Sequence, residues 1–361
     1  LDRALPDLIA ALREIDPDGL RFGAQARRLL AEATQRHGGV DGLADLARTP
    51  GPQRAEAYRD WVDALARAGR TGDAEQTARE ALRELDPHGS VQGWLADRLA
   101  ALAIARDDGA ALLAARRDAW HTDPTVQRLL VLVEVATALD RRDEVLTQEA
   151  GCLAAGPLAQ RPHLAASLPL LAGRVDDASG LMAADPVWEH RRPPGAVVLP
   201  FLLIGGSDAA ADARWPDLLL FELLERVDSI DWPYSFDDDL DDFCAALPPG
   251  SFSAVIGGDL LLSTLLVETL SRQSAGPEQR RQWLDDARAH IDSWVDSVVS
   301  GKHRGSYQRI AELAAACAEA LALAAGAAAG HAYLNGLHDR YPRHSSFRKE
   351  LRSAAAKSPV L

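Results

Sequence analysis

The sequence predicts an all-α protein in which antiparallel helix pairs stack as an α-solenoid, interrupted by one loop-rich insertion. Alanine and leucine dominate the apolar residues, and aromatic residues make up only 6% of the chain, which favours helices over strands. Apolar residues recur at helical spacing, and glycine turns with Asp-Pro or Gly-Pro steps divide these segments into pairs. A single helix pair cannot bury its apolar side alone, so we expect successive pairs to stack.

Residues 55–87 form the clearest predicted pair. Its first helix presents large apolar residues, Gly69 ends that helix, and its second helix presents small residues before Pro87 closes the pair. The large and small positions are Tyr58, Trp61, Val62, Leu65, Ala74, Ala78 and Ala81. Alanines allow close approach of a neighbouring helix, so we expect Trp61, Leu65 and Ala78 to be buried.

This pair resembles a tetratricopeptide (TPR) repeat, with the closing proline one position later than the family spacing. A second, weaker copy ends at Asp123-Pro124, with an Asp107-Asp108-Gly109 turn in place of the single glycine. Further copies are expected to end at Gly156-Pro157 and Asp185-Pro186. The resemblance implies a TPR-like α-solenoid, a non-enzymatic scaffold that mediates protein–protein interaction. TPR repeats commonly bind peptides on the concave face made by their first helices.

In the pair at residues 55–87 that face carries Glu56, Arg59, Asp63 and Ala66. The three charged residues are therefore candidate partner-binding residues. TPR domains that bind the C-terminal carboxylate of chaperones carry Lys and Asn on this face, and Arg59 and Asp63 depart from that pattern. A chaperone-tail receptor is thus disfavoured, and an ordinary solvated helix face is the simpler alternative interpretation.

Three regions are expected along the chain. Residues 1–50 form an N-terminal helical cap, residues 51–190 hold the TPR-like pairs, and residues 191–361 form a C-terminal helical region with an acidic insertion at 229–252. The segment HRRPPG, residues 190–195, is the candidate linker. Turns are expected at His37-Gly38-Gly39 and at Gly205-Gly206.

The C-terminal segment resembles the tails of bacterial SWIM zinc-finger proteins and of related uncharacterised bacterial helical proteins. The shared elements are His303-Arg304, Tyr307, an Ala/Leu-rich helix, Tyr341-Pro342-Arg343, Phe347 and Leu351. The zinc-binding cysteines and histidines of a SWIM finger are absent from the sequence. The resemblance therefore implies, as an alternative, an accessory C-terminal region of a SWIM-type protein whose chemistry lies elsewhere.

An acidic run is the most distinctive local feature of the sequence. It consists of Asp237, Asp238, Asp239, Asp241 and Asp242. It matches the D-D-x-x-D pattern with which all-helical terpene synthases hold Mg²⁺ against a diphosphate, because hard cations prefer clustered carboxylates. An all-α metal-dependent enzyme is therefore an alternative function.

The second metal motif of those enzymes has no good match, so we favour exposed carboxylates that contact a basic partner. Phe236, Leu240 and Phe243 are spaced four and three residues apart. We expect them to attach one short helical turn to the body of the protein while the carboxylates face water.

Other candidate sites are weaker. Asp286 and His290 lie four residues apart on one helix face, and His331 and His338 lie two turns apart, but neither pair has a third ligand of matching type nearby. Ser251 beside Gly250 lacks the preceding strand of a nucleophile elbow. We therefore expect no catalytic residues, no metal and no cofactor.

Composition excludes several classes of protein. The net charge of −14, from 53 acidic and 39 basic residues, disfavours binding of nucleic acid by this region. Cys152, Cys244 and Cys317 form no CxxC pair, and no run of eighteen apolar residues is present, so we expect a cytoplasmic location and no membrane association. No signal peptide is recognisable, and because the sequence begins with Leu1 rather than methionine, a fragment of a longer protein is expected.

Overall fold

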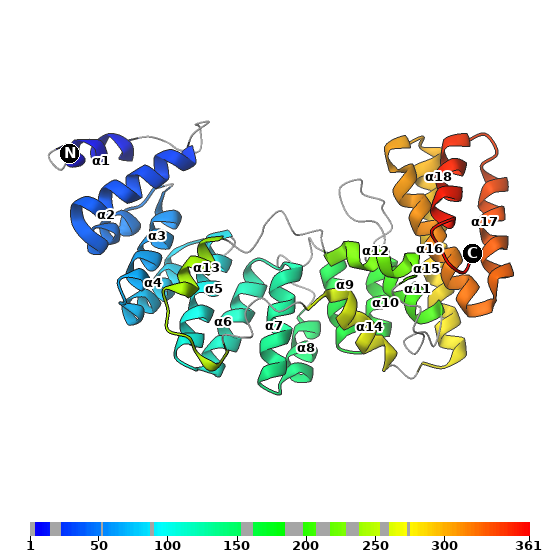
Figure 1. Cartoon of the computed structure of the whole chain (residues 1–361), viewed down its shortest axis with the longest axis horizontal. Coiled ribbons are helices and arrows are strands. Elements are labelled where there is room, and N and C mark those ends of the chain that lie inside the picture. Colours follow the sequence, from blue (N-terminus) through cyan, green and yellow to red (C-terminus); the bar gives the residue numbers. More distant parts are fainter. Residues whose placement is uncertain are drawn as a thin grey trace. The chain divides into compact units, whose positions relative to one another are not determined.

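The computed structural model describes residues 4–14, 23–51, 53–86, 90–152, 162–184, 198–206, 217–228, 238–252, 260–272 and 275–361. Within these residues the chain forms eighteen α-helices and no strand (Figure 1), which confirms the predicted all-α class. The predicted closing residues Pro87, Gly156-Pro157 and Asp185-Pro186 and the linker at 190–195 lie outside the described residues.

The chain divides into two compact units. Unit 1 comprises Leu1–Asp140 and Tyr234–Gly258, and unit 2 comprises Arg141–Pro233 and Asp259–Leu361. This division does not coincide with the boundaries expected near residues 50 and 190. From Tyr234 onward, the acidic insertion groups with the N-terminal helices and not with the C-terminal region.

Helices of unit 1 pack on one another in chain order. They are α1 (Leu5–Arg13), α2 (Gly23–Arg48), α3 (Arg54–Arg67), α4 (Thr71–Glu84), α5 (Ser90–Ala105), α6 (Gly109–Thr122) and α7 (Val126–Ala138), joined by α13 (Asp238–Ala245). Each of α1 to α6 contacts the next helix, α3 also contacts α5, and α13 lies on α3 and α5. The turn expected at residues 37–39 is a kink inside α2, where Gly39 has a φ of 68° and a ψ of −163°.

The apolar side of α3 forms the core predicted from its spacing. Tyr58 and Leu65 are fully buried, Trp61 is 6% exposed, and Ala78 on α4 is fully buried. Burial of Trp61, Leu65 and Ala78 is thus confirmed. Helix α6 ends at Thr122, immediately before the predicted stop at Asp123-Pro124.

Helices α3, α5, α7 and α9 are each followed, two residues after their last residue, by a residue with left-handed backbone geometry. These residues are Gly69, Asp107, Asp140 and Gly173, with φ angles of 73°, 54°, 56° and 73°. After three of them the next amide closes the helix by a hydrogen bond to a carbonyl five residues earlier, from Arg70 to Leu65, Asp108 to Ala103 and Arg174 to Pro169. This is the closure of a Schellman motif, which glycine adopts without strain. The predicted breaks at Gly69 and at residues 107–109 are therefore confirmed.

Unit 2 is organised around one buried helix, α16. Its helices are α8 (Arg142–Gly151), α9 (Pro162–Leu171), α10 (Val175–Ala184), α11 (Leu199–Gly206), α12 (Leu219–Asp228), α14 (Leu262–Ser271), α15 (Pro277–Ser300), α16 (Tyr307–Ala325), α17 (Ala327–Arg340) and α18 (Ser345–Ala355). Helix α16 contacts α11, α12, α15, α17 and α18. Its many alanines permit this because a small side chain lets several neighbouring backbones approach.

Gly205 and Gly206 are the last two residues of α11 rather than the expected turn, which corrects that prediction. A Cβ atom at Gly206 would lie 3.2 Å from the Cα of Ala320 on α16. The glycines therefore serve close helix packing. In the sequence, a glycine pair that permits close packing of two helices looks the same as a glycine pair that forms a turn.

Glu319 is a fully buried carboxylate in the middle of α16. It accepts hydrogen bonds from the backbone N–H groups of Leu219 and Leu220 at 3.2 and 2.8 Å, and from the Ser358 hydroxyl at 2.6 Å. Burial raises its pKa. The carboxylate accepts hydrogen bonds from backbone N–H groups at the start of α12 that have no acceptor within the helix. We therefore assign Glu319 a structural role rather than a catalytic one.

Three aromatic residues of the C-terminal segment, Tyr307, Tyr341 and Phe347, converge in the structure. The ring of Phe347 lies 5.9 Å from that of Tyr307 and 5.7 Å from that of Tyr341, in edge-to-face geometry. All three side chains are buried. These three rings therefore form a small aromatic core where α16 begins, α17 ends and α18 packs.

Candidate functional site

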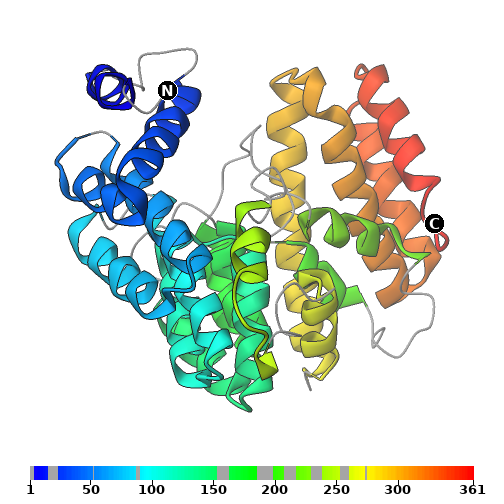
Figure 2. The same cartoon turned by 60° about the vertical axis from the view of Figure 1, so that its left-hand side comes forward.

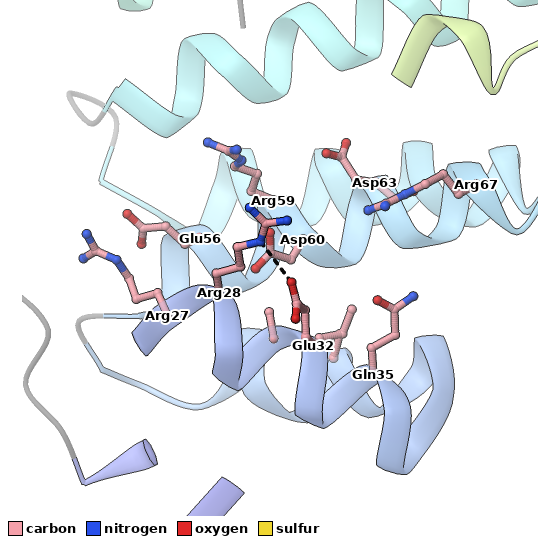
Figure 3. A pocket seen from close by; sticks show the side chains of 11 residues that line it. Arg27, Arg28, Glu32, Gln35, Glu56, Arg59, Asp60, Asp63 and Arg67 are labelled. Carbon is pink, nitrogen blue, oxygen red and sulfur yellow. Dashed lines mark hydrogen bonds and ion pairs between the residues drawn. The ribbon is translucent and has the colours of Figure 1, made fainter. Parts of the chain in front are cut away.

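A polar groove of about 490 Å³ lies between α2 and α3 in unit 1. Its lining consists of Arg27, Arg28, Ala31, Glu32, Gln35 and Leu43 from α2, with Glu56, Arg59, Asp60, Asp63 and Arg67 from α3 (Figure 3). All three candidate residues predicted on α3 are thus brought together in one groove. Asp60, Arg67 and the whole α2 wall were not identified from the sequence.

Helical spacing explains why α3 presents these side chains together. Residues at intervals of three and four share a face, so Glu56, Arg59, Asp60, Asp63 and Arg67 lie opposite the buried apolar side of the same helix. On the other wall, Arg28 donates from Nε to Glu32 Oε1 at 2.9 Å (Figure 3). Both members of this pair are exposed, so the pair contributes little stability.

Two carboxyl groups in this groove are shielded from water. Burial raises the pKa of Asp60 to about 6, against a partial opposing effect of the Arg59 guanidinium. Burial also raises the pKa of Asp63 to about 6, and Arg98 offsets part of that increase. Near neutral pH both groups are charged but poorly solvated. Their charge would therefore be stabilised by a cation that entered the groove.

Replacing Asp60 by asparagine is expected to stabilise the chain at neutral pH by about 1–2 kcal/mol, because a carboxyl whose pKa rises on folding costs stability once it ionises. The folded pKa near 6 lies above the ordinary value of 3.8, so wild-type stability falls as pH rises through this window. At about pH 4 the carboxyl is largely protonated in the folded state, and the gain should disappear. Urea unfolding at both pH values tests this, with exposed Asp45→Asn on α2 as the matched control. An equal gain at both pH values would contradict the assigned cause.

Beyond Asp63 the polar surface continues onto α5. Arg98 Nε lies 3.4 Å from Asp63 Oδ1, and the side chain of Arg98 is only 1% exposed. The Arg98 guanidinium stands 3.4 Å from the centre of a Trp94 ring, and that of Arg59 stands 5.1 Å from it. Trp94 therefore links the end of the groove to the surface of α5.

Helix α13 places the acidic run. Leu240 and Phe243 are each 2% exposed, whereas Asp241 and Asp242 are exposed. The prediction that apolar residues attach a short helix while carboxylates face water is confirmed for these four. Asp238 and Asp239 lie at the start of α13, and Phe236 and Asp237 fall outside the described residues. Contact of these carboxylates with a partner stays a prediction.

Three of the remaining candidate ligands, Asp286, His290 and His338, have other partners. Asp286 accepts a hydrogen bond from Gln282 at 2.8 Å, the ring of His290 lies beside that of Trp294, and His338 lies 2.7 Å from Arg348 Nε. Among the described residues no three His, Cys, Asp or Glu side chains are grouped so that they could hold a metal ion. No described helix has the length and apolar character needed to cross a membrane.

No model of a known protein family matches this sequence, and no curated protein or solved structure is significantly similar to it. The TPR and SWIM resemblances therefore stay interpretations of the sequence. Function has to be inferred from the residues and the geometry of this chain.

Proposed function

We propose that this chain is a non-enzymatic helical scaffold of TPR-like helix pairs that binds a basic segment of a partner protein in the groove between α2 and α3. The observation that carries the proposal is the groove itself, which gathers Glu56, Arg59 and Asp63 with further charged residues from α2. Binding of nucleic acid is not part of this proposal, because the net charge of −14 opposes it.

Recurring turn geometry supports the repeat part of the proposal. The left-handed residues 69, 107, 140 and 173 follow one another at intervals of 38, 33 and 33 residues. Five residues after each of them stands a fully buried apolar side chain, namely Ala74, Leu112, Val145 and Ala178. A repeated turn followed by a buried position at constant offset is typical of stacked antiparallel helix pairs.

Charge in the groove supports a basic ligand. Asp60 and Asp63 are charged at neutral pH despite their burial, so a lysine or arginine side chain between them would recover electrostatic energy that water does not supply. The arginines of the rim, Arg27 and Arg67 among them, would then contact carboxylates or carbonyls of the same segment. Net negative charge also steers basic segments toward this chain.

Binding can be measured with a defined probe, a fluorescein-labelled peptide of alternating lysine and alanine. We expect the fluorescence anisotropy of this peptide to rise to a plateau as the protein is added. The corresponding peptide of alternating glutamate and alanine should show no increase. Asp60→Asn should weaken binding by about tenfold, since loss of one desolvated charge contact costs at least the corresponding 1.4 kcal/mol.

The matched control is Asp339→Asn in unit 2, at an exposed residue. It changes the net charge by the same amount and should have little effect on the affinity for the peptide. Equal weakening by both variants would show that binding follows net charge and not the groove. Affinity should also fall as salt is raised, because part of the attraction is screened.

A further inference from the structure

The segment Asp238–Phe252, here called the strap, lies along α5 of unit 1 although more than a hundred residues separate the two in sequence (Figures 1 and 2). Near its start, the Phe243 ring lies 5.4 Å from the Arg98 guanidinium. In its middle, a small apolar cavity separates the strap from Ala101 and Ile104 of α5, and its strap side is lined by Cys244, Ala245, Leu247, Pro248 and Pro249. At its end, the strap contacts the turn that follows α5.

That last contact is closely fitted. The Ser251 backbone N–H and hydroxyl both donate to Asp107 Oδ1, at 2.5 and 2.6 Å. These bonds lower the pKa of the Asp107 carboxyl. A side chain at Gly250 would collide with the carbonyl oxygen of Ile104, so only glycine permits this approach. The end of the strap is therefore closely fitted to the turn that follows α5.

The chemistry of that surface is cationic and aromatic. Arg98 contacts the rings of Trp94 on α5 and Phe243 on the strap. Burial raises the pKa of the Cys244 thiol, and the positive charges of Arg116 and Arg98 oppose part of that increase. The strap presents an amphipathic helix with two buried apolar anchors, while its carboxylates Asp241 and Asp242 face water. The Phe243 ring is the anchor that meets the Arg98 guanidinium, in a cation–π contact.

The helix of the strap depends on its contacts with α3 and α5 for stability. Its helix has only eight residues, and a helix of this length is not stable without tertiary contacts. Within that helix, the buried anchors are Leu240 and Phe243. Segments with few buried contacts open well before global unfolding. Opening of the strap would expose the surface on α3 and α5 while the other helices stay folded.

We propose that the α3–α5 surface beneath the strap is a docking site for an acidic amphipathic helix with a Leu-x-x-Phe anchor in a partner protein. The strap is the chain's own copy of that ligand and competes with it. The site adjoins the α2–α3 groove, since Arg98 lies 3.4 Å from Asp63, but the proposal does not depend on what the groove binds. The expected composition of the partner helix is taken from the strap, which already lies on this surface.

Cys244 provides a reporter for this test, because it is half-buried on α13. The full chain carrying Cys152→Ser loses its exposed thiol, and Cys317 is fully buried, so alkylation by iodoacetamide reports opening of the strap. Phe243→Ala in the chain should raise the alkylation rate of Cys244 several-fold while the helical circular-dichroism signal of the chain is retained. Ser251→Ala should give a smaller increase, because it removes one hydrogen bond at the other end.

The probe for docking is a fluorescein-labelled synthetic peptide of residues 238–252 with Cys244→Ser. It should accelerate alkylation of Cys244 in the chain to a saturating level, and the same peptide with Phe243→Ala should not. It should also bind more tightly to the Phe243→Ala chain than to the parent, because the chain's own strap competes less. Unchanged alkylation in the folded Phe243→Ala chain would overturn the proposed opening. Fast alkylation without saturable peptide binding would overturn the docking site.

Discussion

Replacing Trp61 by alanine is expected to lower the free energy of unfolding by about 3–5 kcal/mol, the usual cost of emptying a large aromatic site in a core. The side chain lies on the inward side of α3, which packs on α2 and α4. Its ring lies 6.2 Å from that of Tyr58, and the Arg48 guanidinium covers it at 4.9 Å. Both neighbours lose a packing surface when the ring is removed.

Urea unfolding followed by circular dichroism measures this loss. Leu29→Ala on α2 is the matched control, since Leu29 is 44% exposed and should cost less than about 0.5 kcal/mol. A loss below about one kcal/mol for Trp61→Ala would contradict the burial of this residue and the arrangement of α3.

Helix α3 and its core could be predicted because the signal is local. The spacing of Tyr58, Trp61 and Leu65 follows the helical repeat, and Gly69 is a residue for which a left-handed stop carries no strain. Gly39 and Gly206 show where local reasoning fails. Both suggested turns, yet one is a kink inside α2 and the other packs against Ala320. What distinguishes them is the neighbouring helix, which no local pattern contains.

The candidate site could be predicted only in part for the same reason. Glu56, Arg59 and Asp63 share a face of one helix, so spacing alone placed them together. Their α2 wall depends on how two helices pack, and the strap depends on a contact between α13 and α5 across a long stretch of sequence. Even so, the spacing of Leu240 and Phe243 correctly indicated that this acidic segment is attached by one apolar side.

A buried ionic network in unit 1 escaped prediction from sequence. Asp97 on α5 is 6% exposed and accepts from Arg116 on α6 at 2.7 Å and from Arg128 on α7 at 2.9 Å. Arg128 also bonds the backbone carbonyl of Asp123 at 2.9 Å. The only local sign was a charged pair, Asp97-Arg98, within an otherwise apolar helix. One carboxylate thus joins three successive helices.

The fit around this network is tight. A Cβ atom at Gly93 would meet the Arg128 guanidinium at 3.0 Å, so the glycine gives that side chain its path to Asp97. Asp97→Asn keeps the shape of the site but leaves two shielded guanidinium groups without their shared negative charge. We expect a loss of about 3–5 kcal/mol in the free energy of unfolding, the usual result of breaking a buried ion pair from one side.

Removing the cation as well separates electrostatics from packing. In Asp97→Asn with Arg116→Met, one of the two stranded charges is gone, so the double variant should be more stable than the sum of the single losses predicts. Chemical unfolding of the four proteins of this cycle gives the coupling energy directly, expected at about 1–3 kcal/mol for groups in contact. Exposed Asp45→Asn on α2 gives the background effect of losing one carboxylate. Strict additivity in the cycle would mean that Asp97 stabilises the three helices by its shape alone, and the ionic role assigned to it would be wrong.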